Sequence, residues 1–401
     1  MIDFTLSPAQ HQTRADAIAF ATLLLAPARH SYAKLPPSQR FASTRPILEK
    51  ATSLGLIRSQ IPPALGGTGG SLIDVCLVVE ELYAVEPSIA LTLLSNALGL
   101  ATLVAGGTGE QHKEFLEPFL SGEGAPLASL VYSEPEGSAN FFEKGGEGMR
   151  TMAKREGDEW VLNGEKVCIR FLPGAPALPL VEGDGCPQDF EADGVPNKIW
   201  ATNCAGWDDG GADLQCVVCR DSSVTGDDPE AAAMILLVTR ALIDAHPPTA
   251  YTVLAHPTMP GHTACSGPHV KFTDLRIPTS HVLAAPGTGA TSKLITGAFT
   301  MTAAIVGAMS VGIMRKTFDS ALHFTKAEKR GGSMQLLERQ SVADVLIDIK
   351  MRAEAARYLT WKAAQSVELG VGHGELAFEA KIWCSEAAVR SVADAMRVVG
   401  M

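Results

Sequence analysis

Residues 130–140 read LVYSEPEGSAN, a short stretch that decides the fold only in combination with motifs elsewhere in the chain. An apolar run typical of a buried strand ends at Ser133, and a Glu-Pro turn then leads to Gly137 and Ser138. The pattern predicts a strand end that presents backbone amides and hydroxyl groups to a ring carbonyl or a phosphate. Taken alone, Gly-Ser after a Glu-Pro turn is more often an ordinary turn.

The character of the chain changes twice on either side of this stretch. Ser7 and Pro8 are predicted as the N-cap and first residue of a helix, and a helical period continues to about residue 121. Short β-rich runs follow without regularly alternating helices, which favours an antiparallel barrel or sandwich. Helices return from about residue 291, where an apolar stripe from Val342 to Leu359 predicts a long bundle helix. We therefore predict an α+β fold with an N-terminal α-helical domain (1–122), a middle antiparallel β domain (123–285) and a C-terminal helical bundle (286–401).

Composition excludes several classes of function. The net charge is −11 and no run of Lys or Arg occurs, so nucleic acid is not expected as a partner. The longest apolar runs carry a charge well before the roughly 20 residues that span a bilayer, so no membrane span is predicted. The N-terminus lacks a secretory signal, which predicts an intracellular, cytoplasmic protein. A peroxisomal protein is the alternative, with its signal expected beyond Met401. Cys216 and Cys219 lack a second cysteine pair and are predicted to be buried thiols, with no metal site.

An irregular segment separates two orderly motifs between Asn163 and Asn203. The alternation in EWVL (159–162) before NGEK predicts a strand that enters an Asn-Gly hairpin. The residues that follow are rich in Pro and Gly and have neither a helical nor a strand period. We interpret 167–198 as an insert, either a retained intron or a genuine surface loop. The absence of any element of its own favours the intron, although chain entropy tolerates a long loop.

The order of the motifs SEPEGSAN, NGEK, IWATN, VKFTDLRIP and RGGSMQLLERQ resembles the acyl-CoA dehydrogenase superfamily over essentially the whole chain. The resemblance implies that FAD is bound at the junction of the three domains and across a subunit contact in a homotetramer. The residues that match the family's FAD-binding positions are Tyr132, Ser133, Gly137, Ser138, Trp200, Thr202, Arg330 and Gln340.

The resemblance also implies a role for each matched residue. The main chain of Ser133, with Tyr132 beside it, meets the flavin pyrimidine edge, and Gly137 and Ser138 lie near the pyrophosphate. In the same way Trp200 flanks the ring, and Thr202 donates a hydrogen bond near flavin N5, where charge builds up on reduction. Arg330 and Gln340 reach the phosphates and adenine side of FAD in a neighbouring subunit. Without the shared motif order, a core role for Trp200 and a solvated helix end for Arg330 would be the simpler interpretations.

Within the superfamily, CAGWDDGGADL (204–214) together with SEPEGSAN and RGGS resembles the fungal nitroalkane oxidase branch. That branch implies oxidation of nitroalkanes to aldehydes or ketones, with release of nitrite and hydrogen peroxide. Dehydrogenation of an acyl-CoA thioester is the alternative. Two departures weaken it: the altered EPEGSAN turn, and Thr302 and Ala303 at the positions after GAF where a base and an arginine are expected.

No residue of the sequence matches the family's catalytic base. The carboxylate that takes the α-proton is expected beyond Met401, and Thr302 is expected at most to support it by a hydrogen bond. A non-catalytic fragment or scaffold that keeps the fold is therefore a third hypothesis.

Overall fold

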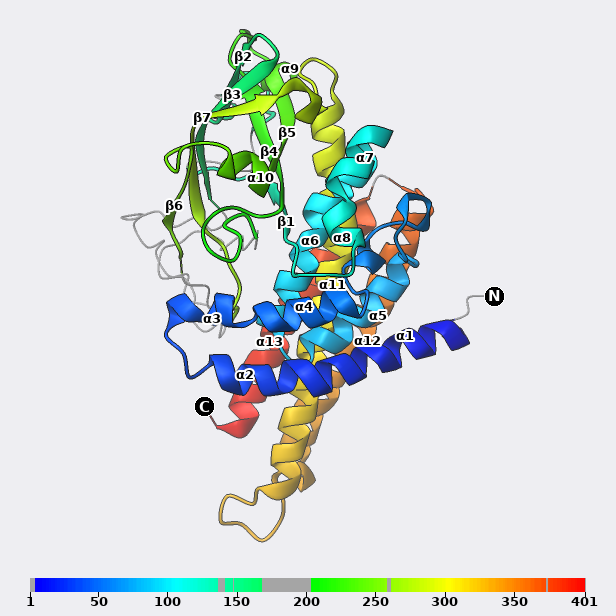
Figure 1. The fold of residues 1–401 in the computed structure, drawn as a ribbon. Coiled ribbons are helices and arrows are strands. Elements are labelled where there is room, and N and C mark those ends of the chain that lie inside the picture. The colour runs from blue at the N-terminus through cyan, green and yellow to red at the C-terminus, as the bar shows by residue number, and fades with distance from the viewer. Residues whose placement is uncertain are drawn as a thin grey trace. The chain divides into compact units, whose positions relative to one another are not determined.

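The helices and strands form two compact units in the computed structural model, which describes residues 4–135, 141–146, 148–167, 203–257, 261–372 and 374–400 (Figure 1). The helical unit comprises Met1–Ser31, Gly70–Ala90 and Phe299–Met401, and the sheet unit comprises Tyr32–Gly69 and Leu91–Ala298. Apart from Val167, the predicted insert lies outside the described residues. Its interpretation as an intron or a loop stays a prediction.

The helical unit contains an N-terminal helix pair, one central helix and a C-terminal bundle. Its elements are α1 (Pro8–Phe20), a short π-helix (Ala21–Leu25), α2 (Ala26–Tyr32, which ends in the sheet unit), α5 (Leu72–Tyr83), most of α11 (Ala290–Ala327), α12 (Gln340–Glu368) and α13 (Glu375–Val399). Ser7 caps α1 as predicted, because its side chain accepts from the Gln10 amide and Pro8 occupies the first turn.

The C-terminal bundle packs through small residues, as the stripe on α12 predicts. Ala353 and Ala356 of α12 meet Val311 and Met314 of α11 and Cys384 of α13 in one buried cluster. Small side chains allow the three helix axes to approach closely. Figure 1 shows the described parts of these three helices running side by side.

Buried ion pairs connect α5 to its neighbours in the helical unit. Glu80 pairs with Arg315 of α11 and Arg357 of α12, each at 2.9 Å, and Glu81 pairs with Arg315 and with Arg14 of α1. Burial raises the pKa of Glu81, but the two arginines outweigh it and hold the net pKa below its ordinary value. Two adjacent carboxylates are tolerated there because three guanidinium groups compensate them.

Among the described residues, the sheet unit combines several helices, of which α6 has 20 residues, with a sheet of eight strands. The helical elements are α3 (Pro37–Ser43), α4 (Arg45–Ser53), α6 (Pro87–Gly106, which begins in the helical unit), α7 (Gly109–Phe115), α8 (Glu117–Leu120), α9 (Pro229–Ala232) and α10 (Arg240–Asp244), with 3-10 turns at Arg58–Gln60, Pro63–Leu65 and Thr279–His281. The strands are β1 (Ala128–Val131), β2 (Met152–Glu156), β3 (Glu159–Val167), β4 (Leu214–Asp221), β5 (Ala233–Thr239), β6 (Tyr251–Ala255), β7 (His269–Pro278) and β8 (Val282–Ala284).

The sheet is mixed, which corrects the expectation of a purely antiparallel sheet. The strand order is β6-β7-β3-β2-β4-β5-β8, with β1 paired to β4. Both β1 and β2 run parallel to β4, whereas the other pairs are antiparallel. The β1 strand follows helices α6 to α8, and no tight hairpin dictates its direction.

The Asn-Gly pair at 163–164 forms a bulge and not the predicted hairpin turn. β3 continues through it to Val167, and its register with β7 shifts between Leu162 and Gly164. Gly164 has φ +146°, and a Cβ atom there would lie 2.6 Å from the Thr151 Cα. The neighbouring Asn163 side chain exchanges two hydrogen bonds with Asp274 of β7, which holds the bulge in place. The tight turn that joins β2 to β3 lies earlier, at Gly157 and Asp158.

The cysteines and the long apolar helices have the following environments. Cys216 and Cys219 are buried in β4 as predicted, and burial raises the pKa of each thiol to about 12. Two helices, α6 and α11, are long and apolar enough to cross a membrane by length and composition alone. This corrects the expectation that a charge interrupts every long apolar run, because the 20 residues of α6 carry none. Half or more of each apolar window is buried inside the protein, as in a core helix. The absence of a membrane span stays a prediction.

Replacing Gly312 by Ala should destabilise the helical unit. A Cβ atom at Gly312 of α11 would lie 2.5 Å from the Glu80 carbonyl oxygen of α5, a contact that only a backbone shift can relieve. We expect a loss of about 1–3 kcal/mol in the free energy of unfolding. Gly297→Ala on the same helix is the matched control, because its Cβ atom meets nothing within 4 Å. It should gain about 0.5–1 kcal/mol from helix propensity. Equal effects of the two substitutions in denaturant titrations would contradict this packing.

Candidate functional site

The end of β1 places two of the predicted site residues next to each other. Tyr132 and Ser133 follow the last residue of the strand and are both partly exposed. The Ser133 carbonyl accepts a hydrogen bond of 3.0 Å from the Val167 amide. Its hydroxyl group has no hydrogen-bond partner among the described residues. The Tyr132 ring packs edge-on against Phe141 at 5.2 Å. The strand end therefore offers a hydroxyl donor and a fixed aromatic ring.

A buried ion pair holds this strand end in position. Lys166 of β3 donates to the Glu134 carboxylate and to the Tyr132 carbonyl, both at 2.9 Å, and its side chain is only 1% exposed. Glu134 also accepts from the backbone amides of Arg150 and Thr151, at 2.7 and 3.0 Å. The carboxylate and the ammonium group are thus compensated although water cannot reach them.

Burial and the neighbouring charges shift the pKa values of these groups. Burial raises the pKa of Glu134, but the Lys166 charge and the backbone amides outweigh it, so the net pKa is lowered. Burial also lowers the pKa of the Lys166 ammonium against the opposing effect of Glu134. The pKa of Tyr132 is raised to about 12 by burial and then by the Glu134 charge. The phenol therefore remains a neutral hydroxyl at physiological pH.

A second buried anchor fixes the residue that follows the IWAT segment. Asn203 donates through Nδ2 to the Thr92 carbonyl at 3.1 Å and to the Asn96 side-chain oxygen at 3.0 Å. The same oxygen of Asn96 accepts from the Ala128 amide at the start of β1. One buried side chain on α6 therefore ties together β1 and the end of the IWATN motif.

The remaining predicted residues fall into two groups. Gly137, Ser138, Trp200 and Thr202 lie outside the described residues. Thr302, Arg330 and Gln340 belong to the helical unit. The Thr302 hydroxyl donates to the Phe299 carbonyl. Gln340 is exposed at the start of α12, and its side-chain amide donates to Asp344. Arg330 is also exposed; its guanidinium group lies over the Phe324 ring and donates to the Val399 carbonyl. Arg330 has φ +50°, in the left-handed region that is unusual for a residue other than glycine.

Sequence reasoning gave no role to Glu134, Lys166, Asn96 or Asn203. The first two stood inside the quoted motifs SEPEGSAN and NGEK, where a Glu and a Lys in two buried strands could have indicated an ion pair. Asn96 had no signal, because it lies in an apolar helix far from the motifs in sequence. Within the described ranges, no group of three or more His, Cys, Asp or Glu residues could hold a metal ion.

Removing one partner of the buried ion pair should be far more damaging than removing both. Lys166→Met leaves an uncompensated buried carboxylate and should lower the free energy of unfolding by about 3–5 kcal/mol. The double variant Lys166→Met with Glu134→Gln should be clearly more stable than the sum of the single effects, because neither charge is then left alone.

Lys154→Met serves as the control for this cycle. Lys154 pairs with Glu156 on the surface, and its side chain is 69% exposed, so the change should stay within about 0.5 kcal/mol. Thermal unfolding of the four variants measures the cycle. Additive effects of the Lys166 and Glu134 substitutions would show that the two groups do not depend on each other.

Comparisons with known proteins match both ends of the chain to one family. Residues 7–123 match the model of the acyl-CoA dehydrogenase N-terminal domain, and residues 292–401 match that of the acyl-CoA dehydrogenase C-terminal domain. A probable acyl-CoA dehydrogenase of Mycobacterium tuberculosis is 29% identical over 98% of the chain and 86% of its own length.

Two fungal relatives are more similar. Nitroalkane oxidase of Podospora anserina is 49% identical over 100% of the chain and 87% of its own length, and nitroalkane oxidase of Fusarium oxysporum is 41% identical over 100% and 86%. The solved structure of Podospora anserina nitroalkane oxidase has a TM-score of 0.89 at 47% identity and covers 100% of this chain and 88% of that one. The helical domain, sheet domain and helical bundle are those of these relatives, and the chain belongs to the acyl-CoA dehydrogenase family of FAD-dependent oxidoreductases.

Proposed function

We propose that this protein is an FAD-dependent oxidase of nitroalkanes. The observation that carries the proposal is the identity of 49% to a nitroalkane oxidase over 100% of this chain and 87% of that relative, against 29% to an acyl-CoA dehydrogenase. The overall reaction would convert a primary nitroalkane, oxygen and water to an aldehyde, nitrous acid and hydrogen peroxide. This balance needs no coenzyme A and no protein electron acceptor.

The described end of β1 supports FAD as the cofactor. Ser133 carries a partly exposed hydroxyl without a partner among the described residues, beside a strand end whose carbonyl groups are already bonded to Lys166 and Val167. A donor held in this way suits the acceptor-rich pyrimidine edge of a flavin. When bound, FAD would supply the two-electron acceptor that the reaction needs and pass the electrons to oxygen.

The residues of this chain would bind and orient the cofactor. Tyr132 and Ser133 would hold the ring edge, and Lys166 and Glu134 would keep their backbone in place. Gly137, Ser138, Trp200 and Thr202 remain assigned to the pyrophosphate and the ring by the motif match alone. No described residue is assigned as the base. Thr302 is proposed to support that base by a hydrogen bond.

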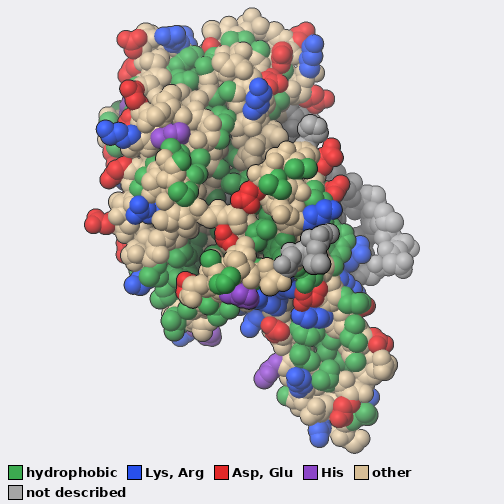
Figure 2. Space-filling model, turned by 90° about the vertical axis from the view of Figure 1, so that its right-hand side faces the viewer, with side chains coloured by type: hydrophobic (Ala, Val, Ile, Leu, Met, Phe, Trp, Pro, Cys, Tyr) green, Lys and Arg blue, Asp and Glu red, His purple; other side chains and the backbone are tan. Residues whose placement is uncertain are grey.

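We also propose a homotetramer, in which Arg330 and Gln340 reach FAD bound in another subunit. Both residues are exposed in the helical unit. The same unit has an apolar groove of about 270 Å³ between residues of α11 and α12, lined by Leu322, Leu337, Ile347 and Met351 among others. Figure 2 shows hydrophobic side chains gathered over this end of α11 and α12, as expected for a surface that a second copy covers. An intracellular location without a membrane span completes the proposal.

Substrate choice tests the proposed reaction. We expect the protein that is expressed from its own gene and purified with bound FAD to take up oxygen and release nitrite when nitroethane is added under air. Butyryl-CoA should leave the flavin absorbance unchanged without oxygen, because the acyl-CoA reaction needs a deep channel that holds the thioester. Bleaching by butyryl-CoA alone would replace the proposal by the acyl-CoA dehydrogenase alternative. Bound FAD with no response to either substrate would favour the non-catalytic scaffold.

Arg330→Ala tests the proposed subunit contact. We expect weaker FAD retention together with partial dissociation of the tetramer, because one guanidinium group would serve both. A charge-assisted hydrogen bond contributes about 1.5–3 kcal/mol, so the FAD dissociation constant should rise by about 10-fold to 100-fold. Arg29→Ala, another exposed arginine of the helical unit, is the control and should change neither property. Gel filtration and flavin absorbance measure both effects, and an unchanged FAD affinity in Arg330→Ala would refute the assignment.

A further inference from the structure

The buried pair of Lys166 and Glu134 places two full charges at the strand end that is assigned to the flavin. The side chains are 1% and 3% exposed, so water screens neither charge effectively. A charge that water cannot reach acts over a longer range than a charge on the surface. A neutral donor such as an amide could also hold the Tyr132 carbonyl, so the position of the strand end does not by itself require an ion pair.

The electric field of the pair reaches Tyr132. The Lys166 ammonium group donates to the Tyr132 carbonyl at 2.9 Å and lies 5.8 Å from the centre of the Phe141 ring, which packs edge-on against the Tyr132 ring. Burial is the first cause that raises the pKa of the Tyr132 phenol to about 12, and the Glu134 charge is the second. Both charges therefore act on a residue that is assigned to the flavin edge.

The two charges have opposite effects on a group that accepts electrons. Reduction adds negative charge to a flavin, so a nearby ammonium group favours reduction and a nearby carboxylate opposes it. The Glu134 carboxylate accepts from the Arg150 and Thr151 amides, at 2.7 and 3.0 Å, and from Lys166. The amides are neutral dipoles, and the Lys166 ammonium group is the charge that offsets the carboxylate.

We propose that Lys166 and Glu134 set the reduction potential of the flavin, because Lys166 offsets the negative field of Glu134 at the ring edge. Both are positioning residues, which act through the segment that carries Tyr132 and Ser133. The inference rests on the proposed function, which assigns the flavin edge to that segment. Burial also gives the pair a role in stability, and the test separates that role from the effect on the potential.

The test is an anaerobic reductive titration of the FAD-loaded protein beside a dye of known potential. At a given potential, Lys166→Met should lower the ratio of reduced to oxidised flavin by about tenfold, because the carboxylate then lacks its counter-charge. Glu134→Gln should raise this ratio by about tenfold, because the ammonium group is then left alone. A tenfold change in a two-electron couple corresponds to about 30 mV. The double variant should return to within about twofold of the wild-type ratio, because both charges are absent.

The pH of each titration keeps the remaining charge in place. Burial disfavours a lone carboxylate and a lone ammonium group, which raises the pKa of the first and lowers the pKa of the second. Lys166→Met is therefore measured at about pH 8, where a carboxylate is more fully ionised, and Glu134→Gln at about pH 6, where an ammonium group is more fully protonated. Each variant is compared with the wild-type protein at the same pH.

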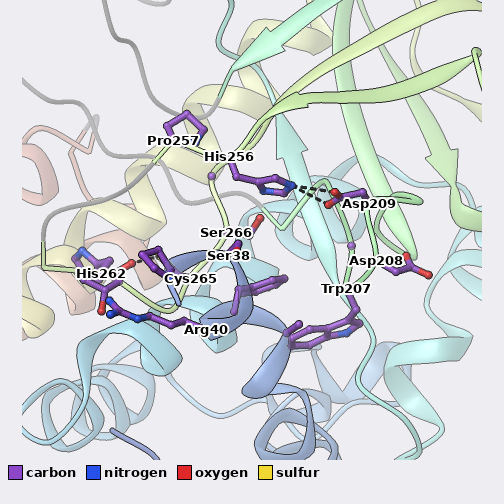
Figure 3. A pocket seen from close by; sticks show the side chains of 16 residues that line it. Ser38, Arg40, Trp207, Asp208, Asp209, His256, Pro257, His262, Cys265 and Ser266 are labelled. Carbon is purple, nitrogen blue, oxygen red and sulfur yellow. Dashed lines mark hydrogen bonds and ion pairs between the residues drawn. The ribbon is translucent and has the colours of Figure 1, made fainter. Parts of the chain in front are cut away.

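Asp209→Asn is the matched control for Glu134→Gln, because it also exchanges a paired acid of the sheet unit for its amide. Asp209 pairs with His256 at 2.9 Å, as the dashed lines in Figure 3 mark. Both residues line a cavity of about 600 Å³ between α3 and the loops that carry Trp207 and Ser266, and none of the described flavin residues lines it. The Asp209 side chain is 55% exposed, so water screens its charge and the potential should not change.

Lys154→Met is the corresponding control for Lys166→Met. It removes an exposed ammonium group that pairs with Glu156 on the surface of the same unit. The flavin potential should again stay at the wild-type value, because solvent and salt screen this charge.

Opposite shifts in the two single variants support the inference, because a purely structural role displaces the same backbone in both and does not reverse the sign. Shifts of one sign, or shifts no larger than those of the two controls, overturn it. If Lys166→Met folds too poorly to hold FAD, the rise in Glu134→Gln and its reversal in the double variant decide instead. Absence of the rise or of its reversal overturns the inference.

The outcomes also separate this inference from the proposed function. A wild-type protein that holds no FAD refutes the proposed cofactor and the inference together. A protein that holds FAD but releases no nitrite from nitroethane refutes the proposed reaction alone, and the shifts in potential are still expected. A protein that oxidises nitroethane while the two single variants keep the wild-type potential overturns the inference and leaves the proposed function intact.

Discussion

The ion pair between Lys166 and Glu134 is the constraint on which the described part of the candidate site depends. Both side chains are almost completely buried, so water cannot replace the carboxylate as the partner of the ammonium group, or the reverse. Lys166 also donates to the Tyr132 carbonyl, and the next amide along β3 donates to the Ser133 carbonyl. The position of the strand end is therefore set by β3, and the hydroxyl group of Ser133 remains available to a ligand.

Asn96 has a comparable effect at the start of β1. Its side chain bonds the start of β1 and also Asn203, so a single residue on α6 controls the relative position of two segments that are far apart in sequence. The loop that follows Asn203 carries Trp207 to the cavity wall.

Charge compensation in the helical unit follows the same physical logic. Adjacent Glu80 and Glu81 would repel each other in a buried helix, but arginines from α1, α11 and α12 surround them. The pairs connect α5 to the bundle in one arrangement, because moving any of these helices would separate buried charges from their partners. Such networks specify which helices are neighbours, a task that a uniformly apolar stripe performs poorly.

Much of this protein could be predicted from its sequence, because the relevant signals are local or repeat along one element. The Ser7 cap, the apolar stripe of α12 and the apolar strands around Ser133 depend on neighbours within a few residues, and the motif order indicated the family. Three structural features could not be predicted, because they depend on residues more than a hundred positions away in the chain or on the direction of a strand in the sheet. The Asn-Gly pair forms a bulge because Asp274 of β7 binds Asn163, and β1 runs parallel to β4 because no hairpin joins them. The cavity beside Ser266 exists only where α3, the loop at Trp207 and the loop before β7 meet, a juxtaposition that no local pattern encodes.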